Sequence, residues 1–325
     1  MDWLEVTVYT TSEGIESVCG NLYQLGITGL QIEDEADFKD FLENNHQYWD
    51  YVDDELMKEK EKETCVKAYV SDNATGHEML MLIRQAMKVL KEYDSDGKFG
   101  RLAIEVGNLS EEDWANNWKK YFHPMEIGEK IMIKPEWEEL KAPTDRIVFN
   151  INPGMTFGTG SHYTTRLCIE ELEKYVDETK NVLDLGCGSG ILSIISLMLG
   201  AKSALAADID PNCIDVAYAN AKRNNVDTSK YEVISGNIIS DDKVIDYIKK
   251  LKYEVVLANI VADVIIAIAP LAAECITDDG IFITSGIIED RIGDCTKALE
   301  ENGFNIIEIR REKDWAAIVS NRKAE

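Results

Sequence analysis

The stretch VLDLGCGSGILS, from Val182 to Ser193, decides the fold. It begins as a short buried strand, ends in a helical pattern, and has Gly186, Gly188 and Gly190 between the two. Glycine suits such a turn because it allows a tight bend and lets a ligand approach the backbone more closely than a Cβ would permit. The stretch therefore predicts a strand, a turn that binds a nucleotide-like cofactor, and a helix.

The glycine spacing indicates the kind of cofactor. A dinucleotide fingerprint, G-x-G-x-x-G, that began at Gly186 would need a third glycine where Ile191 stands. One that began at Gly188 would meet Ser193 instead. The chain has D-x-G-x-G-x-G, led by Asp184, which resembles motif I of the class I S-adenosylmethionine-dependent methyltransferases. Because this cofactor has no pyrophosphate, the turn need only pass its backbone around the amino-acid end of the cofactor.

Polar residues end two further predicted strands. Asp208 ends SALAAD, 22 residues after Gly186, where an acidic side chain can accept both ribose hydroxyls. Asp210 precedes Pro211 and is better explained as a helix N-cap. Asn259 follows an apolar strand at the carboxyl edge of the sheet, so we expect it to contact cofactor or substrate, although a plain turn residue is the alternative.

The chain alternates helix and buried strand from Tyr163 onward, which is typical of a parallel sheet covered on both faces. The predicted strands are NVLDLG, SALAAD, YEVISG, YEVVLANI and GIFITSG. The tail, FNIIEIRREKDWAAIVSN, predicts an antiparallel pair at the sheet edge. We therefore expect an α/β fold, Rossmann-like with seven strands. Before this region, KIMIKPEW and RIVFNINPG are two extended segments that lead into the loop starting at Asn152.

The first third of the chain has the order β-α-β-β-α-β, which predicts a smaller ferredoxin-like α+β domain. Its first helix is predicted to begin with Ser12 as N-cap. An acidic insertion near 38–63 interrupts this pattern. We expect three parts: a ferredoxin-like domain over 1–108, a linker helix within 109–130 and a catalytic domain over 131–325.

The predicted linker helix begins with a capping box from Ser110 to Asp113. Trp114, Trp118 and Tyr121 follow at helical spacing. An aromatic stripe of this kind is more often buried between domains than used to bind a ligand.

Composition excludes several classes of function. Among 325 residues, 34 are basic and 60 are acidic, which gives a net charge of −26. Such a surface repels nucleic acid and attracts basic proteins, unless the charge serves only solubility. No membrane span or signal peptide is evident, and seven cysteines without a C-x-x-C pair and four scattered histidines predict reduced thiols and no metal. We expect a soluble, cytoplasmic monomer.

At this point a family resemblance is clear. The stretches NPGMTFGTGSHYTT, VLDLGCGSGILSI, ADIDP, LANI and SGII, with DWANNWKKYF upstream, closely resemble the bacterial methyltransferases of ribosomal large-subunit protein eleven. The resemblance runs from about Glu111 to the end of the chain. It implies methylation of lysine side chains and of the N-terminal amine of that ribosomal protein, with the N-terminal domain recognising the substrate. It further implies that the cofactor is held by five residues: Thr165, Gly186, Gly188, Asp208 and Asn259.

This chain departs from the family pattern DPGxAFGTGTHxTT at three fixed positions and at one variable position that is usually Pro. Asn152 stands where the family usually has Asp, and Thr156, Ser161 and Tyr163 replace Ala, Thr and Pro. The family pattern also implies that Phe157 packs near the cofactor, although it can equally be the core of its own loop. These departures concern the channel for the amine more than the cofactor.

Methyl transfer to nitrogen requires a neutral amine about 3 Å from the methyl carbon and the exclusion of water. Burial of the amine favours its neutral form, so no dedicated base or metal is required. The catalytic residues are therefore unassigned, and Asn152 and Asn259 are candidates for positioning the amine. The alternatives are a lysine methyltransferase of another cytosolic protein, a dinucleotide-dependent oxidoreductase and a non-catalytic module that binds the cofactor.

Overall fold

The computed structural model describes residues 3–27, 29–34, 63–94, 96–107, 123–140, 142–152 and 162–322. The chain divides into two compact units, Met1–Tyr121 and Phe122–Glu325. The expected insertion near 38–63 lies outside the described residues apart from Glu63. The expected linker helix at 109–130 lies outside them from 109 to 122, and its remaining part, 123–130, contains a short strand at Met125–Ile127, so the helix does not extend that far.

The first unit is an antiparallel sheet covered by helices. Its elements are β1 Trp3–Tyr9, α1 Ile15–Gln24, β2 Leu30–Glu33, β3 Cys65–Ser71, α4 Ala74–Tyr93 and β4 Ile104–Val106. The strand order is β2-β3-β1-β4 with every pairing antiparallel. This is the order that the split β-α-β pattern gives, so the ferredoxin-like prediction is confirmed.

Alternation along the strands builds the core of this unit. Val6 and Val8 of β1 and Val66 and Ala68 of β3 are fully buried, and they pack with apolar residues of α1 and α4. The predicted cap of α1, Ser12, is wrong, because the N-cap of α1 is Gly14, which makes no side-chain bond. Thr11, not Ser12, accepts the N–H of Gly14 and opens a short 3₁₀ turn before α1, while the Ser12 hydroxyl donates to Asp34.

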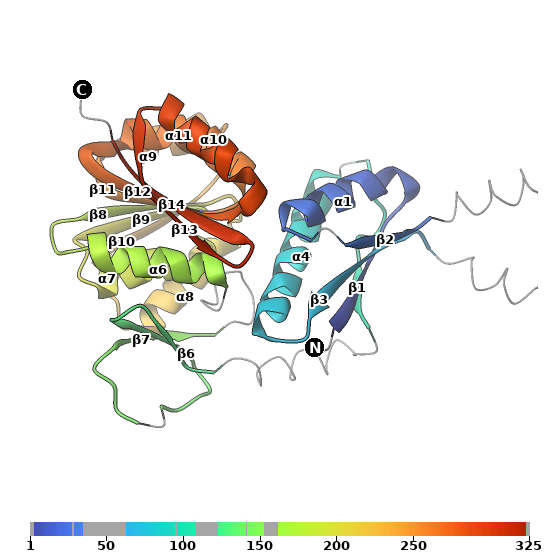
Figure 1. Ribbon diagram of the computed structural model, residues 1–325, viewed down its shortest axis with the longest axis horizontal. Helices are drawn as coiled ribbons and strands as arrows, with labels where there is room; N and C mark the ends of the chain where they lie inside the picture. Colours follow the sequence, from blue (N-terminus) through green and yellow to red (C-terminus); the bar gives the residue numbers. More distant parts are fainter. Residues whose placement is uncertain are drawn as a thin grey trace, which may run out of the picture. The chain divides into compact units, whose positions relative to one another are not determined.

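The second unit is built on a seven-stranded sheet (Figure 1). Its strands are β8 Asn181–Leu185, β9 Ser203–Asp208, β10 Tyr231–Ser235, β11 Tyr253–Asn259, β12 Ile276–Ile288, β13 Phe304–Glu312 and β14 Trp315–Arg322. They lie in the order β10-β9-β8-β11-β12-β14-β13, and the first five are parallel. The last two form the predicted antiparallel pair, with β14 between β12 and β13.

Helices cover both faces of this sheet (Figure 1). One face carries α6 Tyr163–Tyr175, α7 Ile191–Met198 and α8 Asn212–Arg223, and the other carries α9 Asp242–Ile248, α10 Ala262–Cys275 and α11 Ile292–Glu301. The central strands are mostly apolar because both of their sides are buried. The seven-stranded Rossmann-like prediction is confirmed.

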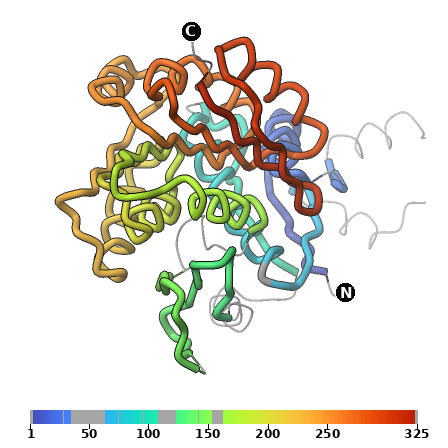
Figure 2. Tube along the Cα trace, turned by 60° about the vertical axis from the view of Figure 1, so that its left-hand side comes forward, coloured from blue at the N-terminus to red at the C-terminus, as the bar shows by residue number. Residues whose placement is uncertain are grey.

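A three-stranded sheet precedes α6 and was only partly predicted. It contains β5 Met125–Ile127, β6 Ile131–Pro135 and β7 Ile147–Ile151, in that order, with β5 antiparallel and β7 parallel to β6. Figure 2 shows this segment in green. Its apolar residues join the core beneath α6, α7 and α8. The sheet therefore fixes where β7 delivers the chain to Asn152.

The turn between β5 and β6 is bound by a carboxylate from α6. Glu173 accepts the backbone N–H groups of Glu129 and Lys130 at 2.8 Å and that of Ile131 at 3.0 Å. Gly128 allows this approach, since a Cβ there would lie 2.5 Å from a Glu173 oxygen. The small sheet is thus held to α6 by polar as well as apolar contacts.

Candidate active site

The glycine turn after β8 has the backbone that its sequence predicts. Gly186, Gly188 and Gly190 all have positive φ, at 79°, 51° and 75°. L-residues with a side chain avoid this region, whereas glycine enters it freely. The N–H of Gly186 donates to the Ala207 carbonyl at 2.8 Å, which fixes the turn against the end of β9. A ligand can therefore lie directly against the backbone here.

Asp208 ends β9 and faces this turn. Its carboxylate accepts the Gly188 N–H at 2.8 Å and the Asp210 N–H at 3.0 Å. The side chain is buried, and this burial raises the pKa of its carboxyl. Asp210 in turn accepts the Asn212 N–H at 2.9 Å, as the predicted helix cap requires.

Asn259 lies at the carboxyl end of β11 and holds an unused hydrogen-bond acceptor. Its Nδ2 donates to the Thr165 hydroxyl at 3.3 Å, and Thr165 is fully buried near the start of α6. Its Oδ1 is also buried, and no described residue donates to it. A buried amide oxygen without a donor costs free energy, so this oxygen is suited to a ligand N–H.

Asp184, which leads the glycine motif, contacts the helix that follows the turn. It is buried in β8, and its Oδ2 accepts the Ser193 N–H at 3.1 Å in the first turn of α7. Burial raises the pKa of Asp184 to about 7. This contact makes Asp184 a cap for the helix that follows the turn.

Sequence reasoning gave no role to His162, although it lies within the quoted loop stretch. It is buried, its Nδ1 lies 2.8 Å from the Thr164 hydroxyl, and its ring centroid lies 4.9 Å from that of Trp315, edge to face. Burial lowers the pKa of His162 to about 4. The ring is therefore neutral near pH 7 and a weak base.

Two predicted loop contacts remain untested. Phe157 lies in 153–161, outside the described residues. Asn152 is exposed at the end of β7, and its amide donates to the Glu136 carboxylate. Its role with the amine remains a prediction.

The described residues fit S-adenosylmethionine. The positive-φ turn gives close backbone approach, Asp208 offers a carboxylate where the ribose is expected, and Asn259 offers a buried acceptor. Among the described residues, no group of three or more His, Cys, Asp and Glu side chains is arranged to hold a metal. Within the same part of the chain, no helix has both the length and the hydropathy of a membrane span. All seven cysteines are buried free thiols.

The fold and this site define a class I S-adenosylmethionine-dependent methyltransferase. Comparison with known proteins gives the particular family. The family model described as ribosomal protein L11 methyltransferase (PrmA) matches residues 2–323 of this chain. The chain belongs to this family.

Similar proteins include the ribosomal protein L11 methyltransferase of Clostridium perfringens, 40% identical over 321 residues that make up 99% of each chain. The protein of that name from Alkaliphilus oremlandii is 39% identical over 323 residues, also 99% of each. The crystal structure of a ribosomal protein L11 methylase from Lactobacillus delbrueckii subsp. bulgaricus is 29% identical, with a TM-score of 0.56. It covers 62% of this chain and 100% of its own.

Proposed function

We propose that this protein transfers methyl groups from S-adenosylmethionine to ribosomal protein L11, at lysine side chains and at the N-terminal amine, acting in the cytoplasm as a monomer. The full-length match to the family supports the substrate. One observation carries the chemistry: Oδ1 of Asn259, beside the cofactor turn, is buried and accepts no hydrogen bond from the described residues.

S-adenosylmethionine supplies an electrophilic methyl group on a sulfonium centre. The chain's own residues bind and orient the reactants. Asp208 accepts ribose hydroxyls, the glycine turn lets the cofactor lie against the backbone, and Thr165 keeps the Asn259 amide in one orientation. These residues form the cofactor side of the site.

Asn259 Oδ1 accepts an N–H of the incoming amine and so aims its lone pair at the methyl group. An amide oxygen suits this task because it carries no charge that would favour the ammonium form. A lysine of pKa ~10.4 must arrive neutral, and the neutral ring of His162, with a pKa of about 4, cannot hold that proton. Desolvation in the site and release of the proton to solvent are then sufficient.

The acidic surface assists the encounter with this substrate. The net charge of −26 attracts a basic protein over distances of about one Debye length, roughly 8–10 Å at physiological salt. This steering raises the association rate more than the affinity.

We expect Asn259→Ala to lower kcat by about 10² while the Kd for S-adenosylhomocysteine changes no more than about threefold, since positioning contributes mainly in the transition state. Single-turnover rates and calorimetry measure the two quantities. Asn181→Ala is the matched control, because Asn181 begins β8 at the opposite edge of the same sheet. Equal losses in affinity and in kcat would assign Asn259 to the cofactor, as the family resemblance implies, instead of the amine.

The substrate is tested by intact-mass spectrometry of unmodified L11 incubated with the enzyme and S-adenosylmethionine. We expect mass increases in steps of one methyl group, absent with the Asp208→Ala variant. If L11 gains no mass although the enzyme binds S-adenosylhomocysteine, L11 is not the substrate. The alternative, a lysine methyltransferase of another basic cytosolic protein, would then stand.

A further inference from the structure

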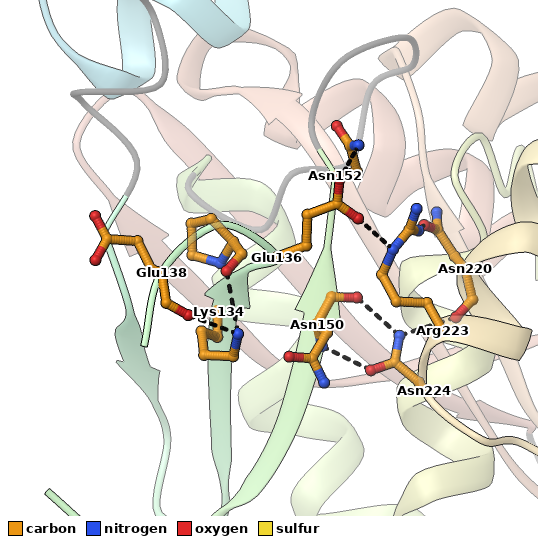
Figure 3. Close-up of polar contacts among 9 residues, drawn as sticks. Lys134, Glu136, Glu138, Asn150, Asn152, Asn220, Arg223 and Asn224 are labelled. Atoms are coloured by element: carbon orange, nitrogen blue, oxygen red, sulfur yellow. Dashed lines mark hydrogen bonds and ion pairs between the residues drawn. The ribbon is translucent and has the colours of Figure 1, made fainter. Parts of the chain in front are cut away.

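A chain of hydrogen bonds runs through the second unit from the end of β7 to the glycine turn. Asn152 Nδ2 donates to one oxygen of Glu136, and Arg223 Nε donates to the other at 2.8 Å (Figure 3). Arg223 Nη1 also donates to Asn220 Oδ1 at 2.5 Å. Asn220 Nδ2 then donates to the Ser189 carbonyl at 2.9 Å. Four side chains therefore join two places that are far apart in the sequence.

Both ends of this chain matter for the site. Asn152 directly follows β7 and opens the stretch 152–165 that ends with Thr165. Ser189 is buried between Gly188 and Gly190. The N–H of Gly188 donates to Asp208, the carboxylate proposed to bind the ribose. The hydrogen-bond chain therefore ends one residue from the group that orients this carboxylate.

Neighbouring contacts hold this chain in place. The Asn224 amide pairs with both backbone groups of Asn150, accepting its N–H at 2.6 Å and donating to its carbonyl at 2.8 Å (Figure 3). Asn224 also donates to the Asn220 carbonyl at 2.9 Å. These bonds join β7 to the end of α8. The backbone on either side of the Glu136–Arg223 contact is therefore held in place.

The residue types at 136 and 152 suit each other. Glu136 uses one oxygen for Arg223 and the other for the Asn152 amide, and only a donor can occupy the second position favourably. An Asp at 152 would place a second carboxylate against the first. The Glu136–Arg223 pair is also partly exposed, at 40% and 26%, so its charge attraction contributes little to stability. Its effect is therefore geometric and depends on the fork of the guanidinium.

We propose that Glu136 and Arg223 are positioning residues: they fix the glycine turn relative to Asn152 at the end of β7 and thereby set the affinity for S-adenosylmethionine. They act through Asn220 and the Ser189 carbonyl, without touching the cofactor. The chain thus adds a layer of residues outside those assigned to the cofactor.

The test exchanges donor and acceptor between positions 152 and 136. We expect Asn152→Asp to weaken S-adenosylhomocysteine binding about five- to tenfold and Glu136→Gln to weaken it about threefold. The two effects should be coupled, because the two side chains are in contact. The double variant should return to within about twofold of the wild type. In it, the amide at 136 donates to the carboxylate at 152 while its carbonyl still accepts from Arg223. Calorimetry gives the Kd, and thermal unfolding confirms that each variant is folded.

Two controls separate positioning from general effects. Glu138→Gln alters an acid of the same segment whose carboxylate faces His123, so its Kd should stay at the wild-type value. Arg223→Lys keeps the charge but offers one nitrogen in place of the two guanidinium nitrogens that donate to Glu136 and Asn220, so it should weaken binding about fivefold.

Two results would overturn the proposal. One is a set of single variants with lowered melting temperatures and an unchanged Kd, which would make the chain purely structural. The other is a double variant whose loss equals the sum of the single losses. Neither measurement uses L11, so this inference can fail while the proposed substrate stands, and the reverse.

Discussion

Replacing Asp208 with Ala is expected to weaken S-adenosylhomocysteine binding by roughly 10² to 10⁴. Each hydrogen bond to a charged group contributes about 1.5–3 kcal/mol, and the ribose offers two hydroxyls to this carboxylate. Asp208 is buried and already oriented by the N–H groups of Gly188 and Asp210, so little ordering remains to be done on binding. Calorimetric titration measures the loss directly.

Asp210→Ala is the matched control for this prediction. Asp210 carries the same charge two residues away, but its carboxylate caps α8 through the Asn212 amide and N–H. We expect a small loss of stability, about 1 kcal/mol, and a nearly unchanged Kd. Asp208→Asn, which keeps one acceptor for Gly188, guards against a variant that simply misfolds. If both positions affected the Kd equally, general charge and not ribose recognition would be responsible.

Gly186→Ala is expected to lower the free energy of unfolding by about 3 kcal/mol and to distort the cofactor turn. The positive φ of Gly186, 79°, costs an L-residue about 1–2 kcal/mol. A Cβ at this position would also lie 2.3 Å from Cγ2 of Ile260, and such overpacking costs about 1–3 kcal/mol. Urea unfolding measures the sum of the two effects.

Gly200→Ala separates these effects. Gly200 also has positive φ, 109°, but a Cβ there would meet no heavy atom within 4 Å. We therefore expect it to show the backbone cost alone, about 1–2 kcal/mol, without a change in cofactor affinity. Equal losses at both positions would show that Ile260 moves aside without cost and that the turn is less tightly packed than proposed.

Local pattern was sufficient for most of the fold. A few neighbouring residues are enough to show a preference for strand or turn. Such local patterns are the alternation in β1 and β3, the apolar strands β8–β12 and the glycines of the turn. Asp208 could be located because the carboxyl ends of parallel strands meet at one edge of the sheet. Asn259 could be located in the same way.

Where the prediction depended on one hydrogen bond, it was less secure. Ser12 and Thr11 are both good N-caps in sequence, and the choice of Thr11 follows from the Ser12 hydroxyl being bound to Asp34, 22 residues away. β5 was missed, within the range expected for the linker helix at 109–130, because three residues carry too short a pattern, and its pairing with β6 defines it.

The sequence by itself therefore determined the order of strands and helices, the glycine turn and the acid that faces it, since these depend on periodicity and on backbone conformations that single residues allow. Only the tertiary structure decided which buried hydrogen-bond acceptor lacks a donor and which residues hold the glycine turn through hydrogen bonds. Asn259 meets Thr165 across 94 residues and Arg223 meets Glu136 across 87. Such contacts are set by the packing of whole elements, and no local pattern records them.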